Sequence, residues 1–319
     1  LSIYWYDAVF QFGILLYIAV LFWGLLCKVF NDVQFHLEQI VYERMSLEDR
    51  MTGLKNRKAF EQDLEKIQKD SVLIRNALLL FIDIAGLKIR MDCKDGMLYE
   101  RSRAYLSKAQ DGKEDFTVAM PDEILKQKAE ALPQLTADEC YYVYMGEAFY
   151  YNLLNHNGIL LHASCIEKDG VAYLFSAKSG VGKSTHTHLW LDKFPDARMI
   201  NDDKPAIRLI DGEYCACGTP FSGKNDESAN IAVPIKAIVF LERGTENKIS
   251  RISPQSAIPL FLAQTIRPSA ASVMDKLLTV LDGVLKNVPI YKLKCNISEE
   301  AVMTSYLGIQ NDLSNGEKQ

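Results

Sequence analysis

The sequence predicts an α/β domain that follows a membrane-length helix. The domain is indicated by the stretch "VAYLFS", Val171–Ser176, whose apolar and aromatic residues predict a buried strand running into a glycine-rich loop. The stretch "THTHLWLDKF" after that loop predicts a helix, and a second short apolar strand precedes two adjacent aspartates. The membrane-length helix is indicated by the uncharged run Ala8–Cys27.

The uncharged run has the length that a helix needs to cross the ~30 Å hydrocarbon core of a bilayer. Aromatic residues lie near both of its ends, where amphipathic rings favour the membrane interface. Basic residues from Lys28 onward favour a cytoplasmic C-terminal side. We therefore expect a transmembrane segment over residues 1–31 and a membrane-anchored protein whose remainder is cytoplasmic. A buried core helix is the alternative, and a chain without this segment is expected to be cytoplasmic.

Composition narrows the classes of partner. The formal net charge is -5 and the sequence pI is about 5.7. These values exclude a broad nucleic-acid surface, because such surfaces concentrate positive charge. A nucleotide, a hydroxyl-bearing acceptor and a membrane remain as partners, and homo-oligomerisation stays open. The seven cysteines are scattered without zinc-ligand spacing, which is typical of reduced thiols in a cytosolic domain.

The stretch "DRMTGLKNRKAF", Asp49–Phe60, resembles the entry motif of GGDEF diguanylate cyclase domains. The resemblance continues to the strand "ALLLFIDI", where Asp83 takes the position of the family's first metal-binding carboxylate. It stops there, because Ala85 stands where the family has a second aspartate and no GG[DE]EF hairpin follows. We expect residues 32–83 to form a linker helix and a truncated GGDEF-like segment without cyclase activity.

The stretch "TADECYYVYMGEAFYYNLLNHNG", Thr136–Gly158, predicts a helix with an N-cap at its threonine and acidic residues in its first turn. Its tyrosines and phenylalanines are expected to form a core or interface face rather than a base-stacking surface, because the chain is acidic overall.

The loop "AKSGVGKST", Ala177–Thr185, fits the phosphate-binding pattern [AG]-x4-G-K-[ST]. Glycines let backbone amides turn toward phosphate oxygens, and the following helix points its positive end at the anion. The lysine is expected to reach the β- and γ-phosphates of ATP, and the serine hydroxyl to bind Mg²⁺. The predicted nucleotide-binding residues are Ser179, Gly180, Val181, Gly182, Lys183, Ser184 and Thr185.

An acid pair follows the phosphate loop. In "ARMINDDKP", Asp202 and Asp203 end a short apolar strand. Because two adjacent side chains of a strand project to opposite sides, one carboxylate is free to hold Mg²⁺ and the other to accept a proton from an attacking hydroxyl. A solvated acidic turn is the alternative interpretation.

The sequence from Gly158 to Arg208 resembles the HPr kinase/phosphorylase family, whose fold is related to phosphoenolpyruvate carboxykinase. His162 takes the family's histidine position, Ser179–Ser184 its loop, and Asp202 and Asp203 its acid pair. The resemblance implies a P-loop kinase domain on a mixed sheet over residues 84–308, followed by a polar tail at 309–319. It also implies ATP, Mg²⁺ and phosphate transfer to a hydroxyl, with His162, Lys183 and Asp202 as catalytic residues and Asp202 as the proton acceptor. Ser184 and Asp203 would hold the metal.

The family's segment that reads its protein substrate is not visible. The loop "GTPFSGK", with Thr219 and Lys224, and the stretch "QTIRP", with Arg267, are candidates for contacts with the acceptor or with phosphate. The acceptor is left open as a protein, a peptide or a small molecule. A second hypothesis is a membrane-tethered signalling protein with a degenerate cyclase segment and a non-catalytic nucleotide-binding domain. A third is that the two ends do not belong to one natural protein.

Overall fold

The computed structural model describes residues 79–93, 96–107 and 114–316. All of these residues belong to Glu61–Gln319, the second of two compact units. The predicted transmembrane segment and the GGDEF-like entry motif lie outside the described residues. Within the described part of the chain, none of the helices combines the length and the hydrophobicity that a membrane span requires.

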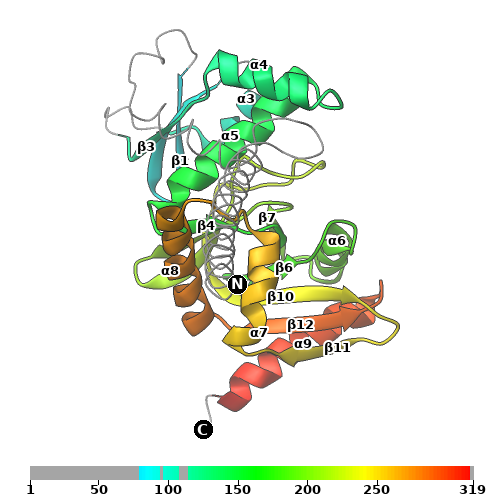
Figure 1. The fold of residues 1–319 in the computed structure, drawn as a ribbon. Helices are drawn as coiled ribbons and strands as arrows, with labels where there is room; N and C mark the ends of the chain where they lie inside the picture. The colour runs from blue at the N-terminus through cyan, green and yellow to red at the C-terminus, as the bar shows by residue number, and fades with distance from the viewer. Residues whose placement is uncertain (1–78, 94–95, 108–113, 317–319) are drawn as a thin grey trace, which may run out of the picture. The chain divides into compact units, whose positions relative to one another are not determined.

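A three-stranded sheet begins the described chain (Figure 1). Its strands are β1 Leu79–Ile84, β2 Leu87–Asp92 and β3 Phe116–Val118. β1 and β2 are antiparallel, and they are joined by Ala85 and Gly86, whose φ angles of 55° and 77° are typical of a tight hairpin turn. Asp83, which the GGDEF resemblance made a metal ligand, accepts a hydrogen bond from the amide of Gly86 at 2.9 Å. The expected boundary between residues 83 and 84 falls inside β1.

Helix α5 contacts both sheets of the described chain, at β3 and at β4. The helical elements of this region are α3 Met97–Ser102, the 3-10 helix η1 Arg103–Tyr105, α4 Asp122–Ala131 and α5 Ala137–Leu154. The predicted N-cap is confirmed, because the Thr136 hydroxyl accepts a hydrogen bond from the Glu139 amide and the Glu139 carboxylate accepts one from the Thr136 amide. The helix ends before Gly158, since that residue begins β4. Its buried tyrosines confirm the core face.

A curled mixed sheet of nine strands forms the larger part of the described fold. Its strands are β4 Gly158–Leu160, β5 Ala163–Lys168, β6 Val171–Ser176, β7 Arg198–Asn201, β8 Ala206–Ile210, β9 Glu213–Cys217, β10 Ala232–Arg243, β11 Lys248–Arg251 and β12 Ile290–Cys295. The order is β4-β8-β9-β10-β6-β5-β7, with β12 paired to β10 and β11 paired to β12. β10 joins the two halves, because its start pairs with β9 in the antiparallel direction and its later part runs parallel to β6 and β12. The predicted α/β class is confirmed.

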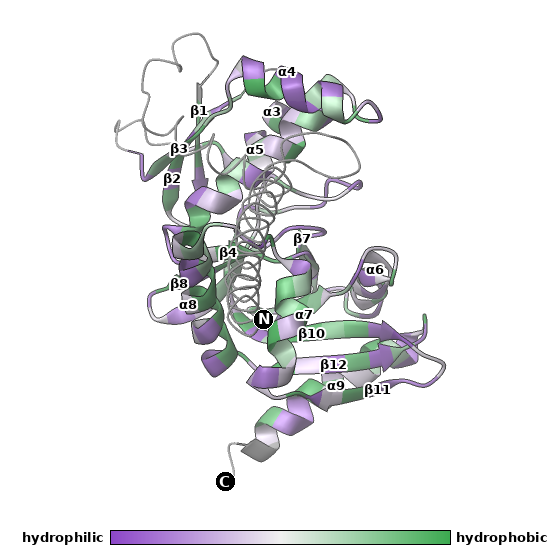
Figure 2. Cartoon of the chain, viewed as in Figure 1, coloured by the Kyte–Doolittle hydropathy of each residue, from purple (hydrophilic) through white to green (hydrophobic). Residues whose placement is uncertain are grey.

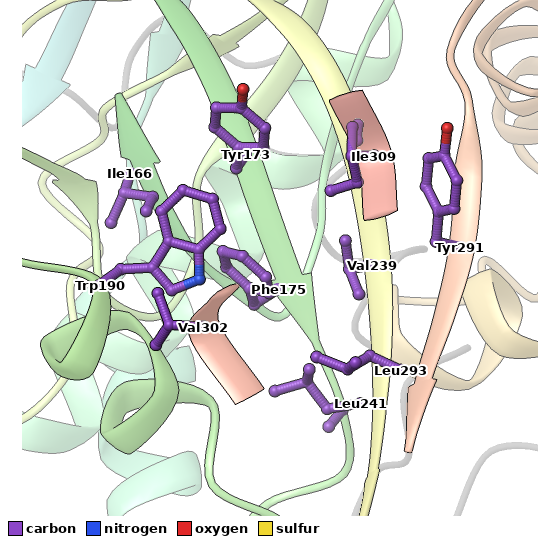
Figure 3. Close-up of a cluster of buried hydrophobic side chains, with 12 residues drawn as sticks. Ile166, Tyr173, Phe175, Trp190, Val239, Leu241, Tyr291, Leu293, Val302 and Ile309 are labelled. Carbon is purple, nitrogen blue, oxygen red and sulfur yellow. The ribbon is translucent and has the colours of Figure 1, made fainter. Parts of the chain in front are cut away.

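The remaining helices are α6 Lys183–Lys193, α7 Pro254–Gln264, α8 Ala271–Asn287 and α9 Glu299–Gly316. Figure 2 shows hydrophobic and hydrophilic residues alternating around α8, and the buried residues of this helix lie at helical spacing. Figure 3 shows Trp190 of α6 beside Phe175 of β6 and Val302 of α9. Trp190 is fully buried, and its indole N–H donates to His186 Nε2 and to the Ser305 hydroxyl, each at 3.2 Å. This anchor fixes α6, and therefore its N-terminus, against the sheet.

Candidate functional site

The phosphate loop connects β6 to α6, as the sequence predicts. Gly180 and Gly182 have φ angles of 77° and 123°, which residues with a Cβ rarely adopt. Gly182 is also the N-cap of α6. The first amides of an α-helix have no partner within the helix, so the start of α6 offers donors and a positive dipole end to an anion. Ser184 and Thr185 lie exposed at this helix start.

The Lys183 ammonium is buried beneath the phosphate loop. It donates to the carbonyl oxygen of Ala177 at 3.1 Å and lies 2.9 Å from His162 Nε2. Burial lowers the pKa of Lys183, and the nearby Asp203 carboxylate opposes that shift. The Lys183 ammonium therefore lies close to the N-terminus of α6. A phosphate oxygen can take the place of its present partners, the Ala177 carbonyl and His162 Nε2.

His162 lies between β4 and β5 and is held by Gln264 of α7. The His162 amide donates to the Gln264 carbonyl at 2.9 Å, and His162 Nδ1 lies 2.9 Å from the Gln264 side-chain oxygen. Burial, followed by the charge of Lys183, lowers the pKa of His162. The neutral ring with its proton on Nδ1 satisfies Gln264 and leaves Nε2 as the acceptor for Lys183.

The acid pair lies in the turn after β7, and Asn201 builds this turn. Its side-chain oxygen accepts from the amides of Asp203 and Lys204 at 2.9 and 2.6 Å, and its side-chain nitrogen donates to the carbonyl of Thr219 at 2.9 Å. The Asp203 carboxylate lies 3.3 Å from His162 Nε2 and 3.0 Å from the Lys204 ammonium. Lys183 and Asp203 therefore contact the same nitrogen atom of His162.

Asp202 has surroundings unlike those of Asp203. It is 5% exposed, and its carboxylate accepts a hydrogen bond from the Gly223 amide. A Cβ on Gly223 would lie 2.7 Å from an Asp202 oxygen, so a glycine is needed at this close approach. Burial raises the pKa of Asp202, and the nearby Asp203 and Glu227 carboxylates raise it further. As the sequence predicts for adjacent residues, the two aspartates have different partners.

His188 connects Glu227 to the phosphate loop. On α6, His188 Nδ1 donates to the Ser184 carbonyl at 2.7 Å, and Nε2 lies 3.0 Å from a Glu227 oxygen. Both ring nitrogens thus face acceptors, which favours the protonated ring, and the hydrogen bond to Glu227 raises the pKa of His188. The Glu227 carbonyl accepts from the Asp202 amide at 3.1 Å. His188 and Glu227 therefore link the Ser184 carbonyl to the Asp202 amide.

The other predicted contact residues have distinct placements. Thr219 is fully buried, and its hydroxyl donates to the Lys204 carbonyl at 2.8 Å, so it stabilises the acid turn. The side chains of Lys224 and Arg267 are exposed, and neither lines the two cavities described next. The structure thus brings together Lys183, His162 and Asp203, places Thr219 behind the acid turn, and leaves Lys224 and Arg267 outside both cavities.

Two cavities lie beside the phosphate loop and His162. The first, here called the loop cavity, has a volume of about 440 Å³ and lies between the phosphate loop with Thr185 and the ends of β10 and β12. Arg243 lines it and donates to the Gly180 carbonyl. The second, here called the α5 cavity, has a volume of about 300 Å³ and is lined by residues of α5 and α7 together with His162 and Lys204. His162 thus lines the α5 cavity. It also contacts Lys183, the first residue of α6, and later residues of α6 line the loop cavity.

Sequence reasoning missed Gln264, Glu227 and Arg243. Gln264 lies 102 positions after His162, and Arg243 lies 63 positions after Gly180. No local pattern marks such partners. Glu227 follows "GTPFSGK" by a few residues. An acidic residue so close to that candidate loop was the one signal in the sequence that could have identified it.

A search of curated proteins found no match. Among solved structures, the chain is similar to the Hpr(Ser) kinase/phosphatase from Coxiella burnetii, with 12% identity and a TM-score of 0.29 over 50% of this chain and 98% of that chain. The family model described as "SynChlorMet cassette protein ScmC" matches residues 132–301. Because this match spans more than half of the sequence, the chain belongs to the SynChlorMet cassette protein ScmC family.

Proposed function

We propose that the chain is an ATP-dependent phosphotransferase, resembling HPr serine kinase, that transfers the γ-phosphate to the hydroxyl of an acceptor. One observation carries the proposal. Lys183 of the phosphate loop and Asp203 of the acid turn lie 2.9 and 3.3 Å from the same atom, Nε2 of His162, and His162 lines the α5 cavity. A protein that only binds a nucleotide needs the phosphate loop but does not need a carboxylate beside a histidine that lines a second cavity.

The loop cavity is the proposed nucleotide site. Phosphate oxygens would bind the free amides at the start of α6 and draw the Lys183 ammonium from the Ala177 carbonyl toward the anion. Arg243 donates to the carbonyls of Gly180 and Val181, which holds the loop in its open turn. When Lys183 moves to phosphate, His162 Nε2 loses the donor whose hydrogen bond it accepts, and the Asp203 carboxylate lies 3.3 Å from this nitrogen.

The residues around Asp202 fit a divalent cation. Burial raises the pKa of Asp202, and the nearby carboxylates of Asp203 and Glu227 raise it further, so a cation here would relieve the repulsion among these acids. No group of three or more His, Cys, Asp and Glu is arranged to hold a metal among the described residues, so protein groups alone do not complete the site. Mg²⁺ typically binds one or two carboxylates together with substrate phosphates and water. We propose that Ser184 and Asp202 hold Mg²⁺ beside the phosphates, where it would neutralise their charge, with Glu227 nearby.

We propose that Asp203 is the proton acceptor. Its partners His162 and Lys204 both line the α5 cavity, whereas Asp202 is buried against Gly223. In the transfer step, the acceptor oxygen forms a bond to the γ-phosphorus and its proton passes to the Asp203 carboxylate. The bond between that phosphorus and the β,γ-bridging oxygen breaks, and ADP leaves with the electron pair. This assignment exchanges the roles that the sequence resemblance gave to Asp202 and Asp203.

Transfer of labelled γ-phosphate tests the proposal. The full chain, purified in mild detergent because of its apolar run Ala8–Cys27, is incubated with Mg²⁺, γ-labelled ATP and either free serine or serine peptides. We expect Asp203→Asn to bind ATP like the wild type and to lose transfer by about 10²-fold or more. We expect Asp202→Asn to need more Mg²⁺ for half-maximal binding of ATP. Tight ATP binding without transfer to any acceptor or to water would instead favour the non-catalytic signalling protein.

A further inference from the structure

We infer that the α5 cavity selects an acceptor whose hydroxyl lies next to an uncharged, apolar group such as an aliphatic or aromatic side chain. This inference rests on the proposed function and names the substrate class of the same site. It is argued from the lining of the cavity, from the partners of its polar groups and from its size.

The walls of the cavity are largely apolar. Val143, Leu160, Phe221 and Ile266 line it, and they come from α5, β4, the loop after β9 and the segment after α7. Gly146 of α5 also lines it, and a Cβ there would lie 3.0 Å from the Phe221 ring. The glycine therefore lets the ring of Phe221 approach the helix closely. Such a surface favours an apolar ligand group, because burying apolar area is favourable without any specific hydrogen bond.

Three polar groups of the lining already have partners within the protein. The Tyr142 hydroxyl donates to the carbonyl oxygens of the loop after β9 at 3.0 Å, and the Thr265 hydroxyl donates to the Leu160 carbonyl at 2.9 Å. The Gln264 side-chain oxygen lies 2.9 Å from His162 Nδ1. A polar neighbour of the acceptor hydroxyl that bound to one of these three groups would have to displace its present bond, and an unpaired buried polar group is costly. Recognition by apolar contact requires no such displacement.

The charges at the cavity disfavour an acidic neighbour in particular. Glu147 lines the cavity. The Lys204 ammonium, which also lines it, lies 3.0 Å from the Asp203 carboxylate and is partly neutralised by it. An acceptor with a carboxylate beside its hydroxyl would place a third negative charge near Asp203 and Glu147. Like charges at this range repel, most strongly where water is excluded.

The size of the cavity limits what enters it. Its volume of about 300 Å³ is at the small end of the range for ligand sites. It therefore suits one large side chain and the carbon that bears the hydroxyl. A residue of a peptide and a free small alcohol share this chemistry, and the experiment below includes one arm for each.

Binding of defined probes tests the inference without requiring transfer. The full chain is titrated with N-acetyl-Leu-Ser-amide, with N-acetyl-Asp-Ser-amide and with 2-phenylethanol, and dissociation constants are measured by calorimetry or ligand-observed NMR. We expect the Leu-Ser probe to bind at least about tenfold more tightly than the Asp-Ser probe, since burial of one leucine side chain corresponds to about that factor or more. Tighter binding of the dipeptide than of the alcohol would identify a peptide acceptor, and the reverse order would identify a small molecule.

A matched pair of variants places the binding in the cavity. Val143, which lines it, and Leu209 of β8, which does not, are both 42% exposed, so each tolerates a larger side chain. We expect Val143→Trp to weaken binding of the Leu-Ser probe at least about tenfold and Leu209→Trp to leave it unchanged. The ATP affinity of each variant reports whether its phosphate loop is intact.

The outcomes separate this inference from the proposed function. Equal affinity for the Leu-Ser and Asp-Ser probes, or full affinity of a folded Val143→Trp variant, would overturn the inference. A wild type that shows the expected preference but transfers no phosphate would keep the apolar site and overturn the phosphotransferase proposal. A wild type that transfers phosphate with equal efficiency to both dipeptides would support the phosphotransferase proposal and overturn the apolar site.

Discussion

Arg101 of α3 holds the loop that binds Asp202, and its substitution is the sharpest test of how α3 stabilises the site. Its side chain is 11% exposed. Its guanidinium donates to the carbonyls of Ser222 and Gly223 at 2.9 and 3.0 Å, to the Tyr142 hydroxyl at 2.7 Å, and lies 3.3 Å from an Asp226 oxygen. The Gly223 amide in turn binds the Asp202 carboxylate. We predict that Arg101→Met destabilises the protein and loosens Asp202.

The magnitude follows from these contacts. Removing one partner of a buried, charged hydrogen-bond network costs roughly 3–5 kcal/mol, and methionine recovers part of the packing. We therefore expect a loss of about 3 kcal/mol in the free energy of unfolding, or a melting temperature lower by roughly 6–12 °C. We also expect the Mg²⁺ concentration for half-maximal ATP binding to rise about tenfold, the equivalent of one net hydrogen bond.

The assay is thermal unfolding of the full chain, together with an ATP-binding titration at varied Mg²⁺. Arg103→Met is the matched control, because Arg103 follows on the same helical stretch, is exposed and contacts the exposed Glu100. Its melting temperature is expected to equal that of the wild type. Equal melting temperatures for Arg101→Met and Arg103→Met would refute the packing argument. A lower melting temperature with an unchanged Mg²⁺ requirement would refute the link from Arg101 to Asp202.

Three further predictions concern the site and its support. Gly223→Ala should lower ATP-dependent activity at least about tenfold at unchanged secondary structure by circular dichroism, because its Cβ would meet Asp202 oxygens. Burial lowers the pKa of His186 to about 4, so the folded state favours the neutral ring and stability is lost as pH falls from about 6.5 toward 4. Between pH 7 and pH 5, urea unfolding of the wild type should therefore lose roughly 2 kcal/mol more than that of His186→Gln; equal losses would contradict this. Trp190→Phe should lower stability by about 1–3 kcal/mol, measured by the same unfolding, because it leaves a void and removes the indole N–H donor.

The parts of the fold and site that the sequence predicted are those encoded locally. The strand before the phosphate loop and the helix after it follow from residue type and periodicity over a short stretch, and the structure has both. The capping box at Thr136 is likewise a pattern of four residues. The sequence also predicted that Asp202 and Asp203 have different surroundings, but the alternation of side chains along a strand is not the reason, because the pair lies in the turn after β7.

The parts that could not be predicted depend on contacts between distant positions. Arg101 binds carbonyls more than 120 positions later, and Gln264 binds a histidine 102 positions earlier. The roles of the two aspartates depend on which of them faces His162 and which faces Gly223, and this is set by the packing of loops. At Asp83 a local motif was misleading. The GGDEF resemblance made its carboxylate a metal ligand, whereas in the structure this carboxylate accepts a hydrogen bond from the Gly86 amide in the same turn.

The central claim is that the phosphate loop binds a nucleotide through Lys183 and that the bound phosphate faces Asp203. Equilibrium binding of ATP to the full chain with Mg²⁺, compared between wild type, Lys183→Met and Asp203→Asn, tests it most directly. We predict saturable, Mg²⁺-dependent binding by the wild type and by Asp203→Asn, and at least about a hundredfold weaker binding by Lys183→Met. A wild type that does not bind ATP, or a Lys183→Met variant that binds it equally well, would contradict the account.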